Sequence, residues 1–145
     1  MGKIKDITVT FPGGQRVDAH YDGRTVATDQ SPEHGGEGAA PEPFDLFWVS
    51  LATCVGVYAL NFCQARKLDT TGLGVRLRTA FDPEEKRFAR VEITITPPRG
   101  FPERHRKSLQ RVADLCAVKK HILNPPSFHL TVAAAPAEEP PGNDA

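Results

Sequence analysis

The sequence predicts an α+β fold in which helices pack on mostly antiparallel strands. Residues 4–29 alternate polar and apolar side chains between turn signals, and residues 44–62 form a long, almost wholly apolar run. Residues 74–81 and 87–96 alternate again on either side of an acidic turn. Residues 103–121 show a second helical pattern, and residues 128–134 form a last apolar stretch. Alternation with period two is typical of half-buried strands, and a long apolar run is typical of a core helix. The expected order is three strands, a helix, two strands, a helix and a strand, which favours the α+β class.

The N-terminal segment is predicted to form an antiparallel meander of three strands. Residues 4–11 alternate, Pro12-Gly13-Gly14 is a turn signal, and residues 15–21 return as a second strand. Asp22-Gly23 is a strong hairpin signal, after which residues 24–29 provide the third strand. This opening alternation also lacks the apolar core of a signal peptide.

A connector rich in Pro, Gly and acidic residues precedes the central helix. Residues 30–43 lack the Lys-Ser/Thr pair that ends a phosphate-binding loop, so a flexible connector is the simpler interpretation. The apolar run at 44–62 has nearly the length of a membrane span, but polar residues on several of its faces favour a buried helix of the core. Pro43 suits the first turn of this helix, and Asp45 complements the positive end of the helix dipole.

The second half of the chain is predicted to add a hairpin, an amphipathic helix and a final strand. Residues 74–81 and 87–96 alternate on either side of the turn, and residues 103–121 place apolar side chains at helical spacing. Residues 128–134 are the expected final strand. Residues 135–145 have the composition of a disordered tail.

Composition limits the functional classes. The 145 residues suit one domain, which we place at residues 1–134. Lys plus Arg and Asp plus Glu both number 18, so no net charge favours nucleic acid or an anionic membrane. Three widely spaced cysteines predict a reducing, cytoplasmic location rather than a secreted disulfide framework. The five histidines show no metal-ligand spacing, and we expect no bound metal.

The three cysteines differ in their expected surroundings. Cys54 and Cys63 are nine residues apart, so on one helix they face opposite sides and cannot form a disulfide. Cys63 is expected to be a small buried hydrophobic residue. Cys54 has an apolar face around it, which leaves a thiol inert unless another element supplies a cation. Cys116 lies on the inward stripe of the second helix, where it is the better candidate for a resolving thiol, although the C-terminal end of a helix disfavours a thiolate. The residues alone leave both a redox pair and purely structural cysteines open.

Two motifs give the chain a resemblance to a known family. Pro43-Phe44-Asp45-Leu46-Phe47 begins the long helix that carries Cys54, and CAVKKHILNPP follows at Cys116. Together with the element order from residue 4 to about residue 134, these motifs resemble the OsmC/Ohr family of thiol peroxidases. The resemblance implies a two-layer fold, an intertwined homodimer with active sites at the interface, and peroxide reduction by a thiol pair without metal, flavin or haem.

The resemblance also implies roles for individual residues. Cys54 corresponds to the peroxidatic cysteine and Cys116 to the resolving one. Arg16, with Arg24 as the alternative, corresponds to the arginine that stabilises the thiolate. Phe44 stands where one branch of the family has a glutamate. Asp45, which we take as its candidate replacement, follows one residue later.

The expected function is therefore cysteine-based reduction of organic hydroperoxides in defence against oxidative stress. The expected partners are a hydroperoxide substrate, a small or protein dithiol as reductant, and a second copy of the chain. The alternative is an OsmC-fold protein that binds an apolar small molecule at its dimer interface and has little or no peroxidase activity.

Overall fold

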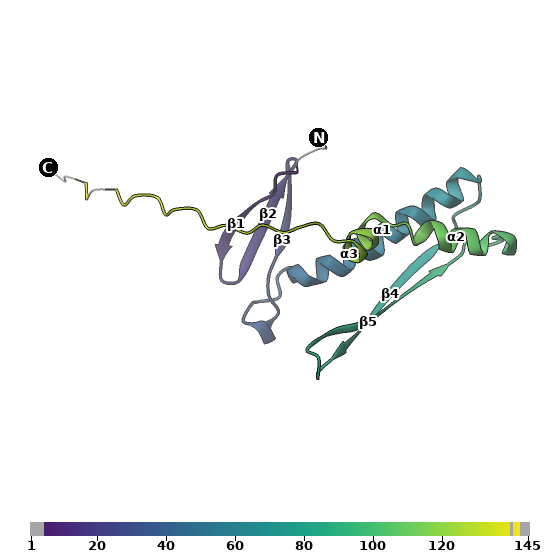
Figure 1. The fold of residues 1–145 in the computed structure, drawn as a ribbon, viewed down its shortest axis with the longest axis horizontal. Helices are drawn as coiled ribbons and strands as arrows, with labels where there is room; N and C mark the ends of the chain where they lie inside the picture. Colours follow the sequence, from purple (N-terminus) through teal and green to yellow (C-terminus); the bar gives the residue numbers. More distant parts are fainter. Residues whose placement is uncertain (1–4, 140, 143–145) are drawn as a thin grey trace.

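The computed structural model describes residues 5–139 and 141–142 and arranges them around one long helix (Figure 1). Its strands are β1 (Thr8–Gly13), β2 (Arg16–Tyr21), β3 (Arg24–Thr28), β4 (Gly74–Asp82) and β5 (Arg87–Thr96). Its helices are α1 (Pro43–Ala65), α2 (Arg106–Ala113) and α3 (Ala117–Leu123), with short 3-10 turns at Pro32–His34 and Glu103–His105. The fold is α+β, as the sequence predicts.

The N-terminal meander forms a separate three-stranded antiparallel sheet. The strand order is β1-β2-β3, and the register pairs Val9 with Ala19 and Ala19 with Val26. This confirms the predicted meander, although the first residue of the expected strand, Ile4, lies outside the described residues. Alternation in β1 directs Val9 and Phe11 to one face, where both are at least half exposed.

Helix α1 begins directly after Glu42 with Pro43 in its first turn, as expected, and ends at Ala65, with Arg66 as the C-cap residue. Its buried residues are Leu51, Val55, Ala59, Phe62 and Cys63. The prediction of a helix buried on all sides is not met within one chain, because several apolar side chains on the remaining surface of α1 are more than half exposed. These are Phe44, Val49 and Val57.

The second sheet is the long β4–β5 hairpin, whose strands are paired from Gly74↔Thr96 to Asp82↔Arg87. Helix α1 packs against both β4 and the helices α2 and α3. The described core has two clusters along α1. The first contains Leu51, Val55, Ala113 and Cys116, and the second contains Ala59, Phe62, Cys63 and Leu109.

Two expectations for the last third of the chain were wrong. The single helix predicted over 103–121 is broken at Cys116, whose backbone is extended (φ −46°, ψ 129°), so that α2 ends before it and α3 begins after it. The predicted final strand over 128–134 is not formed, because a strand requires a neighbour to pair with and this segment extends away from the rest of the chain (Figure 1). Phe128, Leu130 and Val132 in it are almost fully exposed.

Helix α1 is long and apolar enough to cross a membrane by length and composition alone, with a mean hydropathy of 1.7 over its best window. A core helix of a soluble protein meets the same criterion. Its contacts with β4, α2 and α3 make it the centre of this fold.

Candidate active site

The fold brings two of the three cysteines together. Cys54 lies on α1 and packs against the first core cluster, which contains Cys116. Cys63 belongs to the second cluster, further along α1, and is fully buried. All three thiols are free. The predicted separation of Cys54 from Cys63 is confirmed, and Cys116 is the cysteine whose core cluster Cys54 contacts.

Cys54 is surrounded by hydrogen-bond donors from the start of α3. Burial acts to raise the pKa of the Cys54 thiol, but three donors outweigh that effect: the N–H of Val118, the thiol of Cys116 and the N–H of Ala117. The pKa of Cys54 is therefore below its ordinary value. No cation among the described residues takes part in this shift. Activation by backbone N–H groups was not foreseen, because the sequence pointed only to a charged side chain as the source of activation.

Cys116 has the opposite tendency. Burial raises the pKa of the Cys116 thiol, and the adjacent negative charge of Cys54 raises it further, although the N–H of Lys119 donates to its sulfur at 3.4 Å. The loss of a first proton from the pair is therefore easier than the loss of a second. After the first loss the thiolate is on Cys54 and the remaining proton is on Cys116. Cys54 is therefore the more acidic thiol of the pair.

The break before α3 explains this geometry. A continuous helix would have placed Cys116 near a C-terminal end, which disfavours a thiolate. Instead Cys116 caps the N-terminus of α3, and the free N–H groups of the first turn point towards the two sulfur atoms. The expectation that Cys116 lies near the C-terminal end of a helix, which would disfavour a thiolate, was therefore wrong.

The predicted charged residues lie away from the two thiols within one chain. Arg16, on β2, approaches Asp18 at 3.9 Å. Arg24 begins β3 at the hairpin turn, and Asp45 is exposed in the first turn of α1. Among the described residues, no hydrogen bond or ion pair joins Arg16, Arg24 or Asp45 to either cysteine of the pair. Their assigned roles stay predictions, which require a second copy of the chain.

A second polar network holds the connector before α1, where the composition predicted a flexible loop. Asp29 is buried and accepts hydrogen bonds from the N–H groups of Gln30 (2.8 Å), Glu37 (3.3 Å) and Ala39 (3.0 Å). These bonds, led by that of Ala39 and opposed by burial, lower the pKa of the Asp29 carboxyl. An acidic residue beside a Gly-rich stretch is the sequence signal for such a network, because its carboxylate can accept from several backbone N–H groups.

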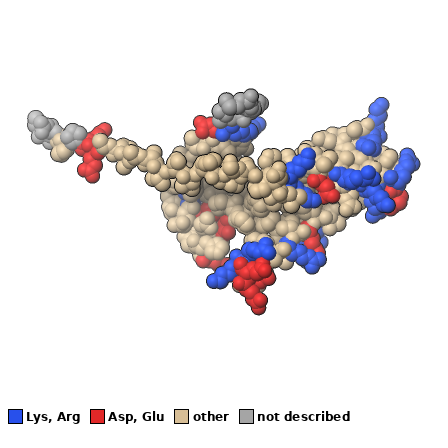
Figure 2. All heavy atoms as spheres, in the orientation of Figure 1, with Lys and Arg blue, Asp and Glu red and all other residues tan. Residues whose placement is uncertain are grey.

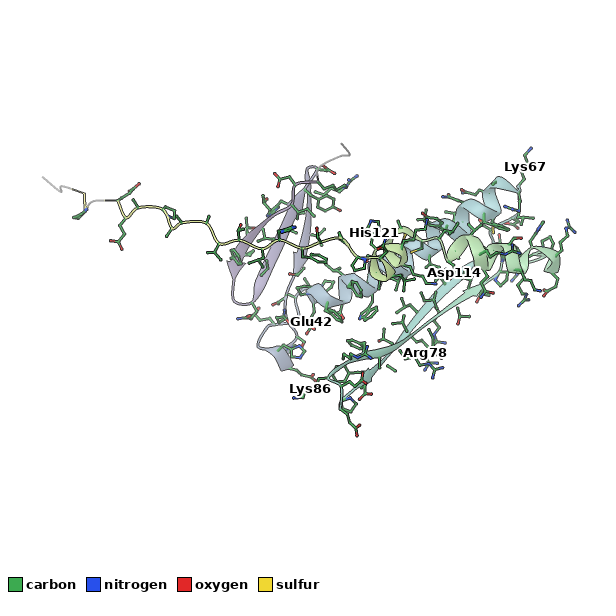
Figure 3. The ribbon with its side chains drawn as sticks, in the orientation of Figure 1. Glu42, Lys67, Arg78, Lys86, Asp114 and His121 are labelled. Atoms are coloured by element: carbon green, nitrogen blue, oxygen red, sulfur yellow. The ribbon has the colours of Figure 1, made fainter. Side chains whose placement is uncertain are left out.

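Glu42, which precedes the first turn of α1, belongs to the same network (Figure 3). Its carboxylate accepts from the Ser31 N–H at 2.9 Å and pairs with His34 at 2.8 Å. Hydrogen bonds from Ser31 and His34 lower the pKa of Glu42 to about 2, while the bond to Glu42 raises the pKa of His34. Neither residue was predicted from the sequence to be part of a site.

An apolar groove of about 760 Å³ lies beside the cysteine pair. It shares Leu51, Val55 and Ala113 with the first core cluster, and extends to Trp48 and Phe88. The two thiols do not line it, so they are separated from the groove by these shared side chains. Polar residues at its edge are Arg106, Gln110, Asp114 and Lys119. The groove can accept an apolar molecule with a polar end.

The fold and the paired thiols define a small α+β protein with a dithiol centre. The family model described as OsmC-like protein matches residues 35–131, and the chain belongs to the OsmC family.

Solved structures show the same fold. A putative osmotic stress induced and detoxification response protein from Psychrobacter arcticus superposes with a TM-score of 0.70 at 24% identity, over 83% of this chain and 89% of that chain. An OsmC-like protein from Mycoplasma pneumoniae gives 0.64 at 19% identity, over 86% and 91% of the two chains. A putative organic hydroperoxide resistance protein from Vibrio cholerae, with captopril bound in one of its active sites, gives 0.57 at 20% identity, over 84% and 87%. No curated protein sequence matches the chain significantly.

Proposed function

We propose that the protein reduces organic hydroperoxides with Cys54 as the nucleophile and Cys116 as the resolving thiol. The observation that carries the proposal is the packing of the free Cys54 thiol against the core cluster that contains the free Cys116 thiol, with the pKa of Cys54 lowered and that of Cys116 raised. Membership of the OsmC family, whose structural neighbours include proteins named for hydroperoxide resistance, supports it.

The chemistry follows from the protonation of the pair. The Cys54 thiolate attacks the outer oxygen of the peroxide, the O–O bond breaks, and an alkoxide leaves with the electron pair and takes up a proton to become the alcohol. Cys54 is now a sulfenic acid. Cys116, after losing its proton, attacks the Cys54 sulfur and expels hydroxide, which becomes water, and the disulfide forms. A dithiol then reduces the disulfide by exchange and is itself oxidised.

A homodimer is part of the proposal. The exposed face of α1, the apolar face of β1 and the unpaired segment 128–134 all lack a cover within one chain. Apolar surface of this extent is typical of an interface. A second copy would bring its own N-terminal sheet, and with it Arg16 or Arg24, towards Cys54, and Asp45 towards the neighbouring site. We further propose a role in oxidative-stress defence in the cytoplasm, where thiols stay reduced.

A thiol count tests the redox mechanism. The reduced protein is treated with stoichiometric cumene hydroperoxide, and free thiols are counted in the wild type and in Cys54→Ser, Cys116→Ser and Cys63→Ser. The wild type and Cys63→Ser should lose two thiols per peroxide, and Cys54→Ser none. Cys116→Ser should stop at a sulfenic acid that dimedone traps. Unchanged thiols in the wild type would contradict the mechanism, and faster consumption of hydrogen peroxide would contradict the organic substrate.

The apolar groove favours a second candidate function, the binding of an apolar small molecule without turnover. Trp48, the single tryptophan of the chain, lines the groove and reports its occupancy. If thiols are unchanged by peroxide while 1-anilinonaphthalene-8-sulfonate saturably alters Trp48 fluorescence, the binding function is supported. A Val55→Phe variant narrows the groove without adding a tryptophan and should weaken that signal change.

A further inference from the structure

Much of the positive charge of the chain lies at one end of the molecule. Residues 99–120 contain seven Lys and Arg against two acidic residues, although the whole chain has 18 of each sign. Figure 2 shows these side chains together over α2 and the far end of α1. We call this surface the basic end, and define it by the exposed side chains of Arg66, Lys67, Arg99, Arg104, Arg106, Lys107 and Arg111.

Most of these charges are not neutralised by a neighbour. Arg106 pairs with Glu103 at 2.8 Å, and the Arg66 guanidinium lies over the Phe62 ring, 3.5 Å from its centroid. In the part of the chain that the structure describes, no ion pair engages the following five: Lys67, Arg99, Arg104, Lys107 and Arg111. Like charges without partners repel their own symmetry copy, so this surface does not suit the interface of a twofold dimer. It suits a different, acidic partner.

The basic end shares helix α1 with Cys54, and its helix α2 ends shortly before Cys116. Arg111 is in the last turn of α2, and Ala113, which ends that helix, packs in the same core cluster as Cys116. A molecule held on α2 therefore approaches the side of the protein where the proposed Cys54–Cys116 disulfide must be reduced. The charges are spread over the end of α1, the loop at residue 99 and α2, which is wider than a small dithiol can contact.

We propose that the basic end docks an acidic protein dithiol, which reduces the Cys54–Cys116 disulfide. This inference rests on the proposed redox function and names the class of its reductant. One partner thiolate attacks the disulfide and expels one cysteine as a thiolate, which leaves a mixed disulfide. The second partner thiolate then attacks the mixed disulfide, so the partner becomes a disulfide, and its two electrons and two protons pass to the cysteine pair. A nucleic acid is the less favoured ligand, because the chain as a whole is neutral and the charges border a thiol site.

The test measures how fast the disulfide is reduced. Diamide forms the disulfide without peroxide, and a reduced thioredoxin of net negative charge is the probe. We compare the wild type with Lys107→Glu/Arg111→Glu, with the neutralised Lys107→Gln/Arg111→Gln, and with the control Lys86→Glu/Arg87→Glu at the tip of the β4–β5 hairpin. At about 10 mM salt the first variant should be reduced at least tenfold more slowly, the neutralised variant should fall between, and the control should match the wild type.

Further measurements distinguish weaker docking of the thioredoxin from a direct effect of the substitutions on the reactivity of the disulfide. At about 0.15 M salt the difference should shrink to about threefold, since screening shortens the range of the charges to about 8 Å. Dithiothreitol, which is neutral, should reduce all variants equally, and a slower reaction with it would overturn docking. Equal rates with the acidic thioredoxin would also overturn the proposal, as would tight binding of a DNA duplex to the basic end with no effect on reduction. If diamide forms no Cys54–Cys116 disulfide, the proposed redox function fails instead, and the docking inference fails with it.

Discussion

At the scale of single residues, the two thiols are distinguished by backbone donors rather than by a charged side chain. The N–H groups of Ala117 and Val118 and the thiol of Cys116 lower the pKa of Cys54, against the effect of burial. This lowering needs no second chain, and the proposed arginine from a second copy would lower the pKa of Cys54 further. The residue types around Cys54, at residues 51–58, gave no sign of these donors, because the donors come from a segment more than 60 residues later.

Removal of one donor should change the titration of Cys54. In Cys116→Ala the thiol that donates to Cys54 is lost, so the pKa of Cys54 should rise towards the ordinary value of about 8.5. The measurement is the pH dependence of iodoacetamide labelling at Cys54, followed by mass spectrometry, with Cys63 as the buried internal control. Cys116→Ser retains a donor and should shift the midpoint less than Cys116→Ala. A midpoint that does not move would show that Cys116 makes no contribution to activation.

The Glu42–His34 pair should make stability depend on pH in a defined window. The pKa of Glu42 is lowered to about 2, so its contribution is complete above its unfolded value of 4.5 and is lost as the pH falls towards 2. The pKa of His34 is raised, so its contribution is complete below its unfolded value of 6.5 and is lost as the pH rises through the folded value. Both contributions are therefore complete between about pH 4.5 and 6.5.

A pH series of thermal unfolding checks this window. His34→Gln should remove the loss of stability on the alkaline side, and Glu42→Gln should remove it on both sides. Asp82→Asn, on a carboxylate outside the network, is the control and should keep the wild-type profile. Parallel profiles for wild type and His34→Gln between pH 6 and 8 would contradict the assignment.

At the scale of elements, the connector before α1 is held by close backbone packing as well as by charge. A Cβ built on Gly36 would lie 2.0 Å from the Gln30 carbonyl oxygen, which is backbone and cannot move aside, and 2.7 Å from a carboxylate oxygen of Asp29. Gly56, in the middle of α1, is different, because its Cβ would meet only Val75 at 4.0 Å. Gly36 is therefore required by close backbone packing, whereas the space around Gly56 admits a methyl group.

Alanine at the two positions should act in opposite directions. Gly36→Ala should lower the thermal midpoint and weaken protection of the Ala39 N–H from hydrogen exchange, since the Asp29 network must open. Gly56→Ala should stabilise the protein by about 0.5–1 kcal/mol, because alanine restricts the unfolded chain and favours a helix. Urea unfolding of both variants provides the comparison. Equal loss of stability at the two sites would show that Gly56 faces a tight contact that a single chain does not contain.

Regular elements were predictable because their signals are local. The meander, α1 and the β4–β5 hairpin follow from alternation, apolar runs and turn residues, and their ends agree within a few residues. The break at Cys116 was not predictable, because the apolar residues keep helical spacing through it. These residues are Leu109, Val112, Ala113 and Cys116. The reason for the extended backbone is visible only in the tertiary structure, where Cys116 packs near Cys54. The segment 128–134 has the pattern of a strand, but pattern does not supply the neighbouring strand on which a ladder depends.

At the scale of the whole molecule, one chain presents two thin layers joined by a partly covered helix (Figure 1). The exposed apolar side chains of β1, α1 and the segment 128–134 lie on different elements, so a flat contact between two rigid copies would not cover all of them. The proposed exchange of segments between two copies would cover these side chains together and would give the backbone of residues 128–134 hydrogen-bond partners. The same exchange would complete each dithiol site with charged residues from the other chain.

The protein should therefore be a dimer whose stability depends on the apolar side chains of its C-terminal segment. Leu130→Asp/Val132→Asp places two charges where both side chains are at least 90% exposed in one chain. The concentration at which half the dimer dissociates should rise at least tenfold, because each charge would have to be buried without a partner. Sedimentation velocity over a dilution series measures it, with Ala137→Asp, beyond the apolar pattern, as the matched control. If the wild type is a monomer at every concentration, the exchange is excluded. If the double variant dimerises like the wild type, the C-terminal segment lies outside the interface and the completion of the site must be assigned to β1 and α1.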